Sequence, residues 1–220
     1  MPYIADSFLG EIDEIQRHYQ IEEWNQSSGY QLPADIPRSR ALKYAKHYGV
    51  NHARELEDAI AVVSKWLEQD VNVIDIGCGP GMSARVLQGL AFNVRRYYGI
   101  DHSESQVWLA RQLNVGTGST CNFSKSLALL PVVKAPLLVI MNHICHQGDV
   151  SETDLHRWAT NLKKMPPYRI LSIEPQLVGA KQGKLLEIFR DHGRRTRELC
   201  NVLTKSQFKT LKLTKVIAVD

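Results

Sequence analysis

The chain has 220 residues, of which 44% are hydrophobic and 23% are charged, and its net charge at pH 7 is +4. This length and composition allow one sizeable hydrophobic core and favour a single domain with an appendage over two equal domains. No apolar stretch is long enough to span a membrane, and the acidic N-terminus lacks the basic-then-apolar pattern of an export signal, so we expect a cytoplasmic protein.

Helical patterns dominate the first third of the sequence. Apolar residues recur at helical spacing in residues 8–19 and again in residues 56–67, and a stretch with two prolines lies between the two patterns. A break between helices is expected near Gly49, where Asn51 could cap the following helix. We therefore expect residues 1–68 to form a helical cap on a core formed by residues 69–220.

Strand and helix patterns alternate from Val71 onward. Strands are expected near residues 71–76, 94–100, 119–123, 137–141 and 169–173, and helices are expected to begin near Pro80, Ser103, Ser151 and Gln182. This alternation predicts an α/β fold with a doubly wound, mostly parallel sheet and helices on both faces. In such a fold, ligands bind beyond the carboxyl ends of the strands.

The first expected strand runs into the sequence VIDIGCGPGM, in which Asp75 is followed by glycines at 77, 79 and 81. Glycine permits positive φ angles and lets a ligand approach the backbone without meeting a Cβ. The spacing differs from the dinucleotide fingerprint G-x-G-x-x-G, because Met82 stands at the third glycine position. There is also no phosphate-loop lysine, so the loop does not match a polyphosphate site.

The segment VIDIGCGPG resembles the cofactor loop of the class I S-adenosylmethionine-dependent methyltransferases, a Rossmann-like family. The family's strand-end acid and alternate glycines match this sequence at Asp75, Gly77, Gly79 and Gly81. The resemblance implies that these residues and Cys78 contact the cofactor, and that the cofactor is S-adenosylmethionine.

The next two strand ends carry further candidates for cofactor binding. Asp101 ends the second strand at about the interval where an acid meets a ribose, and His102 follows it. The alternative for Asp101 is an acid at a helix entry. Asn122 and Phe123 end the third strand, where the resemblance implies contacts with adenine. The alternative is a turn asparagine beside a core phenylalanine.

The fourth strand delivers Asn142, His143, Cys145 and His146 at its exit. The resemblance places Asn142 beside the cofactor. His143, and after it His146, are candidates for a general base, because the ordinary pKa of histidine suits proton transfer at neutral pH. Packing in a loop or core is the alternative for both. No metal site is expected, because these side chains share no common face in a strand or in a helix.

The resemblance implies an enzyme that transfers a methyl group from S-adenosylmethionine to an O or N acceptor. The strand exit lacks the [DNS]-P-P-[YFW] and Pro-Cys segments of the related enzymes that act on exocyclic amines or on cytosine C5. A small-molecule acceptor is preferred, and the N-terminal helices would then form a lid that presents Arg40, Tyr44 or Tyr48. For the two tyrosines, packing between helices is the alternative.

Two other functions stay open. RNA is the alternative acceptor, because residues 181–220 contain ten Lys or Arg against four Asp or Glu. The other possibility is a non-catalytic subunit that binds the cofactor as a sensor or partner. The sequence departs from the family at its end, where residues 208–219 supply one long strand-like run or two short ones. This leaves open whether the last strand of the sheet is missing.

Overall fold

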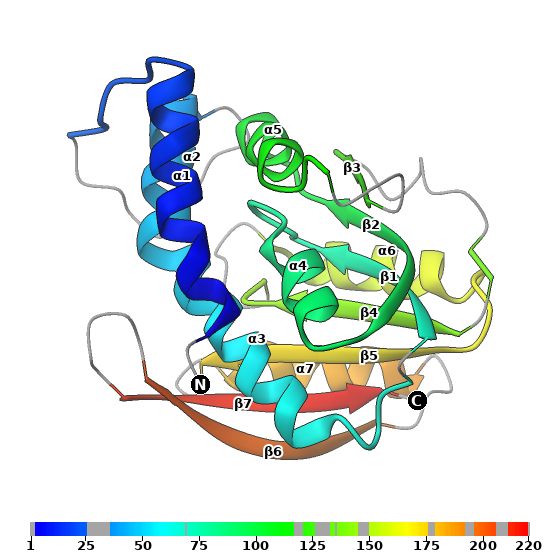
Figure 1. The fold of residues 1–220 in the computed structure, drawn as a ribbon. Helices are drawn as coiled ribbons and strands as arrows, with labels where there is room; N and C mark the ends of the chain where they lie inside the picture. Colours follow the sequence, from blue (N-terminus) through cyan, green and yellow to red (C-terminus); the bar gives the residue numbers. More distant parts are fainter. Residues whose placement is uncertain are drawn as a thin grey trace.

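A seven-stranded sheet with the order β3-β2-β1-β4-β5-β7-β6 lies at the centre of the protein (Figure 1). The computed structural model describes residues 3–25, 36–68, 70–116, 121–125, 133–134, 136–144, 150–175, 179–191, 196–205 and 211–219. Five strands are mutually parallel: β1 (Asp70–Ile76), β2 (Asn93–Ile100), β3 (Cys121–Ser124), β4 (Leu137–Asn142) and β5 (Tyr168–Pro175). The α/β fold with a doubly wound, mostly parallel sheet is therefore confirmed.

The sheet ends in an antiparallel pair, so its last strand is present. Strand β7 (Leu211–Val219) pairs with both β5 and β6 (Thr196–Lys205), and β6 forms the edge of the sheet. The sequence leaves this strand open because residues 208–219 supply one long strand-like run or two short ones. The structure forms one strand, β7, from most of this run, and its antiparallel partner β6 comes from the preceding residues.

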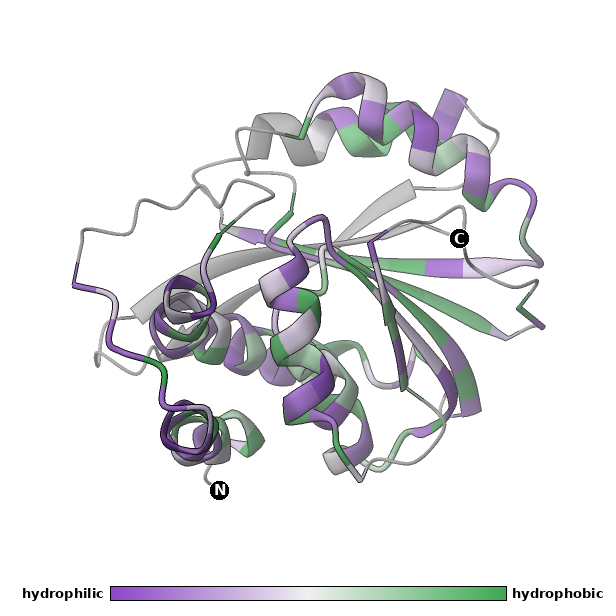
Figure 2. Cartoon of the chain, turned by 90° about the horizontal axis from the view of Figure 1, so that it is seen from above, coloured by the Kyte–Doolittle hydropathy of each residue, from purple (hydrophilic) through white to green (hydrophobic). Residues whose placement is uncertain are grey.

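Helices cover both faces of the sheet. Helices α4 (Met82–Gly89) and α5 (Glu104–Leu113) lie on one face, and α6 (Glu152–Leu162) and α7 (Gly179–Asp191) lie on the other. Seen from above, the strands run between two layers of helices and are largely hydrophobic along their length (Figure 2). Neighbouring strand residues such as Val73 and Ile74 are both fully buried but belong to different core clusters, as expected for a parallel sheet covered on both faces.

The N-terminal helices pack on the same face as α4 and α5. They are η1 (Ile4–Asp6), α1 (Ser7–His18), α2 (Arg38–Tyr44), the π-helical turn η2 (Ala45–Gly49) and α3 (Val50–Val63). The expected break at Gly49 is wrong, because helix geometry continues through η2 and Gly49 keeps a helical φ of −56°. Phe8 and Leu56 share one buried cluster with Val73 and Leu171 of the sheet. The separate role of residues 1–68 as a cap stays a prediction.

Across the part of the chain that the structure describes, none of the helices combines the length and the apolar character that a membrane crossing requires.

Candidate functional site

A cavity of about 500 Å³ lies at the carboxyl ends of β1, β2 and β4. Its walls come from the glycine loop after β1, the ends of β2 and β4, the continuous helix α2–η2–α3 and one side of α6. This volume is in the range of sites that bind small molecules and cofactors. The position agrees with the general location of ligands in open α/β sheets.

The glycine loop is anchored to β2 and open toward the cavity. The N–H groups of Gly77 and Cys78 donate to the carbonyl of Ile100 at 2.7 and 3.0 Å. Gly77, Gly79 and Gly81 all have positive φ, between 50° and 72°. A Cβ on Gly79 would have no atom within 4 Å, whereas one on Gly77 would lie 2.6 Å from the side chain of Ile144. Gly79 therefore offers its backbone to a ligand, and Gly77 permits close packing.

Asp101 fixes the glycine loop from the end of β2. Its carboxylate accepts hydrogen bonds from the N–H groups of Gly79 and Ser103, each at 2.9 Å, and the residue is 8% exposed. His102 lines the cavity beside it, with half of its side chain exposed. An acid held in this way is oriented before any ligand arrives.

Asp75 lies deeper in the cavity wall and is only 1% exposed. Burial raises the pKa of its carboxyl to about 7, and the nearby charge of Asp101 adds to this increase. The hydroxyls of Tyr97 and Ser83 lower the pKa of Asp75, and Tyr97 donates a hydrogen bond to the carboxylate. Burial also raises the pKa of the Cys78 thiol well above its usual value, which disfavours a role as nucleophile.

Two amide side chains on the cavity wall have buried polar atoms that no described residue satisfies. Gln106 of α5 is 1% exposed, and neither its side-chain nitrogen nor its oxygen has a hydrogen-bond partner within the described ranges. The same holds for Oδ1 of Asn142, whose Nδ2 donates to the carbonyl of His52 at 3.0 Å. A buried amide left unsatisfied costs about 1–3 kcal/mol. A polar ligand in the cavity would remove this cost.

Three predicted cofactor residues do not line the cavity: Gly81, Asn122 and Phe123. Asn122 is exposed on β3, and Phe123 is buried behind the loop. A Cβ on Gly81 would lie 2.8 Å from the Phe123 ring, so these two residues pack against each other. Strand β3 ends one residue later than expected, at Ser124, and the residue that lines the cavity on this side is Lys125.

His143 lies at the exit of β4, as expected, and is 2% exposed. Its φ is 58°, an unusual value for a residue with a side chain, and its N–H donates to the carbonyl of Ile173 at 2.8 Å. Its Nε2 lies 2.5 Å from a carboxylate oxygen of Glu55, and its ring stacks on His52 with 3.7 Å between ring centroids. His146 lies outside the described residues.

The structure adds residues that the sequence does not indicate. His52 and Glu55 come from α3, where they read as ordinary helix residues, and Gln106 reads only as the end of a capping pattern. The Ser103 side chain does accept from the N–H of Gln106, but the Gln106 side chain faces the cavity wall instead of completing that cap. Of the three cap residues proposed from the sequence, Tyr44 is the one that lines the cavity.

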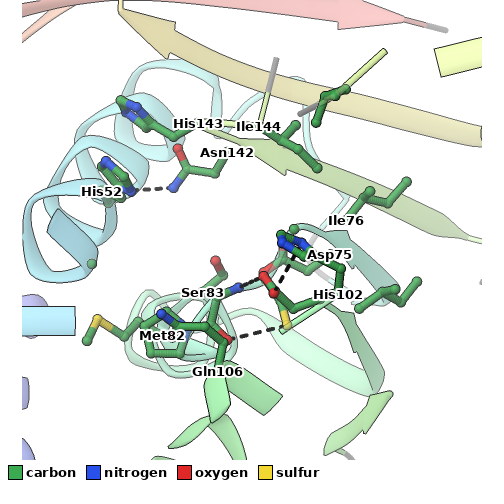
Figure 3. A pocket seen from close by; sticks show the side chains of 18 of the residues that line it. His52, Asp75, Ile76, Met82, Ser83, His102, Gln106, Asn142, His143 and Ile144 are labelled. Atoms are coloured by element: carbon green, nitrogen blue, oxygen red, sulfur yellow. Dashed lines mark hydrogen bonds and ion pairs between the residues drawn. The ribbon is translucent and has the colours of Figure 1, made fainter. Parts of the chain in front are cut away.

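Figure 3 shows how these side chains are distributed around the cavity. His52, Asn142 and His143 lie together on one side, and Asp75 and His102 lie on another. Within the described ranges, no three histidine, cysteine or acidic side chains are grouped so that they could hold a metal ion.

No protein-family model and no curated protein sequence matches the chain. Solved structures resemble its fold. Magnesium protoporphyrin IX methyltransferase from Synechocystis PCC 6803, with bound S-adenosylmethionine, has a TM-score of 0.54 at 19% identity and is matched over 98% of this chain and 94% of that chain. Precorrin-6y C5,15-methyltransferase from Geobacter metallireducens GS-15 has a TM-score of 0.54 at 17% identity, and the match covers 74% of this chain and 86% of that chain.

A candidate RNA methyltransferase from Pyrococcus horikoshii is similar to the same extent. Its TM-score is 0.55 at 11% identity, and the match covers 96% of this chain and 98% of that chain. At these identities the likeness establishes the fold alone. The chain has the fold of the class I S-adenosylmethionine-dependent methyltransferases.

Proposed function

We propose that this chain, built on the class I methyltransferase fold, binds S-adenosylmethionine in the cavity and transfers its methyl group to an O or N acceptor. The observation that carries the proposal is the joint geometry of the glycine loop and Asp101. The backbone at Gly79 is open to the cavity, and Asp101 is fixed beside it by two N–H groups. The Synechocystis structure contains S-adenosylmethionine on the same fold, which supports the cofactor assignment.

The residues around the cavity suit the parts of this cofactor. Asp101 and His102 would hold the ribose hydroxyls, because a carboxylate accepts hydrogen bonds from both. The open backbone at Gly79 leaves room for the amino-acid end. The unsatisfied amides of Gln106 and Asn142 offer additional donors and acceptors. When bound, the cofactor supplies an activated methyl group on a sulfonium ion.

The protein's own contribution is to enclose and align the acceptor. Methyl transfer from a sulfonium requires an acceptor lone pair in line with the methyl group and little water nearby. The helix α2–η2–α3 and α6 bring Tyr44, His52 and Trp158 to the cavity walls. We therefore prefer a small-molecule acceptor. His143, which the sequence suggests as a general base, also lines this part of the wall. The same role for His146 stays a prediction.

The RNA alternative rests on the basic residues of the last forty positions. Most of their side chains lie outside the described part of the protein, so the structure adds no support for it. A location in the cytoplasm also stays a prediction. The non-catalytic alternative differs from the preferred function only in turnover, which makes it an outcome of the same experiment.

The test combines cofactor binding with turnover. Isothermal titration should show S-adenosylmethionine binding to the wild type, and Asp101→Ala should weaken it at least tenfold, since hydrogen bonds to a charged group contribute about 1.5–3 kcal/mol. Asp70→Ala is the control, because Asp70 pairs with Arg95 at the other end of the sheet and should leave the affinity unchanged.

Turnover is then measured as release of S-adenosylhomocysteine with metabolite and RNA pools. Release with metabolites alone is the expected result. Release with RNA alone would move the acceptor to that class, and cofactor binding without any release would support the non-catalytic function. An Asp101→Ala variant that binds the cofactor as tightly as the wild type would contradict the ribose role of Asp101.

A further inference from the structure

Three titratable side chains from distant parts of the sequence meet at one wall of the cavity. His52 and Glu55 lie three residues apart on α3 and therefore on the same side of the helix. His143 reaches them from the exit of β4, with its Nε2 at 2.5 Å from Glu55 and its ring parallel to that of His52 within 6°. Figure 3 shows His52 and His143 side by side with Asn142.

The three residues differ in their access to the cavity. The side chains of Glu55 and His143 are each 1% exposed and engage each other, so Glu55 forms the inner end of the group. His52 is only partly buried, lines the cavity and covers one face of the His143 ring. Among these side chains, His52 is therefore the one that a molecule in the cavity reaches first.

The group is costly to build, which argues against a purely structural role. Removing a carboxylate from water carries a large penalty that a buried partner must offset. His143 also holds a left-handed backbone conformation, which costs about 1–2 kcal/mol for a residue with a Cβ. Two apolar residues would fill the same space without the cost of burying a carboxylate.

Resting on the proposed function, we infer that His52 is the catalytic base for a hydroxyl acceptor and that His143 and Glu55 position it. The acceptor oxygen forms a bond to the methyl carbon while its proton passes to the imidazole of His52. The carbon–sulfur bond breaks and its electron pair stays on sulfur, which becomes a neutral thioether. His52 then releases the proton to solvent.

A base of this kind indicates the acceptor class. A neutral amine already has a free lone pair, whereas a hydroxyl must lose its proton as the new bond forms. His52 stacks on His143, and the Glu55 carboxylate lies 2.5 Å from Nε2 of His143, so a negative charge next to the stacked pair favours the positive charge that His52 acquires. Tyr44 from α2 also approaches His52, with ring centroids 6.4 Å apart. The other charged or titratable side chains on the described cavity wall include the acids Asp75, Asp101 and Asp154 and the bases His102, Lys125 and Arg157.

The first experiment tests access and needs no acceptor. Diethyl pyrocarbonate acylates neutral imidazoles that it can reach, and peptide mass spectrometry locates the product. In the cofactor-free protein we expect His52 to be labelled and His143 to stay unlabelled. His47, which is exposed on η2 and does not line the cavity, is the positive control. Labelling of His143 before His52 would overturn the assignment.

The second experiment measures turnover with a panel of phenols, alcohols and amines. His52→Ala should lower kcat for hydroxyl acceptors by about 10²- to 10⁴-fold, the usual contribution of a general base, with unchanged affinity for S-adenosylmethionine. Added imidazole should restore part of the activity of His52→Gly. Turnover confined to amines, or an unchanged kcat in His52→Ala, would overturn the inference. His47→Ala is the matched control and should behave as the wild type.

A separate measurement tests whether Glu55 and His143 position His52. Glu55→Gln keeps the size of the side chain and one acceptor oxygen, and it should lower kcat while leaving the KM of the acceptor unchanged. An effect on KM alone would contradict positioning. The failure of the two proposals is distinguishable: absence of cofactor binding in the wild type refutes the proposed function, whereas cofactor binding with an unlabelled His52 refutes this inference alone.

Discussion

Gly79 and Gly81 both have positive φ, yet a side chain would meet different surroundings at the two positions. A Cβ on Gly79 points into open space beside the cavity. A Cβ on Gly81 would lie 2.8 Å from the side chains of Ala110 and Phe123, which are both buried. A side chain at position 79 would therefore enter the space beside the cavity, whereas a side chain at position 81 would disturb packing.

This difference predicts opposite defects for two similar variants. Gly79→Ala should cost about 1–2 kcal/mol of stability from its backbone conformation but lower the affinity for S-adenosylmethionine more than tenfold. Gly81→Ala should cost about 2–4 kcal/mol, because crowding adds to backbone strain. Urea unfolding and isothermal titration measure the two effects. Equal losses of stability in both variants would contradict the different surroundings assigned to Gly79 and Gly81.

Asp75 predicts a specific dependence of stability on pH. Its pKa in the folded protein is about 7, against an ordinary value of 3.8. A carboxyl with a raised pKa contributes its full stability below about pH 4, and that contribution is lost as the pH rises through about 7. Asp75→Asn removes this loss, so it should increase the free energy of unfolding by about 2–3 kcal/mol more at pH 8 than at pH 5.

Urea unfolding at the two pH values checks this expectation. Asp70→Asn is a suitable comparison, because Asp70 is at the exposed start of the same strand and Arg95 lowers the pKa of its carboxyl. That variant should gain no stability as the pH rises. An equal gain at pH 5 and pH 8 for Asp75→Asn would show that burial does not control the titration of Asp75.

At the scale of elements, the continuous helix α2–η2–α3 reaches the cavity because η2 lies against the glycine loop. A Cβ on Gly49 would approach the ring of Pro80 to 3.1 Å, so only a residue without a side chain fits comfortably there. Gly49 is followed by α3, which then carries His52 and Glu55 toward the exit of β4. π-helical turns are frequent at functional sites, and this one sets where α3 begins.

The buried carboxylate of Glu57 on α3 anchors the backbone of element η1. Its two oxygens accept hydrogen bonds from the N–H groups of Ile4 and Ala5 at 2.9 and 2.7 Å. Glu57→Ala should lower the free energy of unfolding by about 2 kcal/mol, because it leaves buried donors unsatisfied. Urea unfolding measures the change, and Glu14→Ala on the exposed side of α1 is the control. Equal effects of the two substitutions would refute the anchor.

The sequence predicts the strand ends well and the side-chain partners poorly. Asp75 and Asp101 end apolar runs, so a local pattern locates both of them at the ligand edge of the sheet. Phe123 was expected at the cavity, but the strand continues to Ser124 and the ring packs under the loop. Because the strand ends one residue later than expected, the side chain beside the cavity at this strand end is that of Lys125.

The pair of His143 and Glu55 shows a different limit of sequence reasoning. The two residues are separated by 88 positions, and neither helix periodicity nor strand alternation links them. His143 was a candidate because it follows an apolar strand, whereas Glu55 has no local feature that distinguishes it from a surface acid. Tertiary packing alone brings the two together.

At the scale of the molecule, the N-terminal helices and the sheet share a hydrophobic core. Phe8, Ile12 and Leu56 are fully buried and belong to the same cluster as Val73 and Leu171. Elements joined by such a core are expected to unfold together. We therefore expect the helices of the first 68 residues to unfold together with the sheet in the absence of a ligand.

Hydrogen exchange measured at increasing urea concentrations tests this expectation. Amides in α3 and in the central strand β1 should lose protection in one transition with the same free energy of opening. Earlier loss of protection throughout α3, while β1 stays protected, would show that the helices form an independently opening lid. That outcome would support the two-part organisation expected from the sequence.

Binding of S-adenosylmethionine to the purified wild-type chain is the most direct test of the central claim. Isothermal titration should show one binding site with a dissociation constant between about 1 μM and 1 mM, the usual range for enzyme substrates. The affinity should fall at least tenfold in Asp101→Ala and stay unchanged in Asp70→Ala. No binding to the wild type, or equal binding to all three proteins, would contradict the assignment of the cavity as the cofactor site.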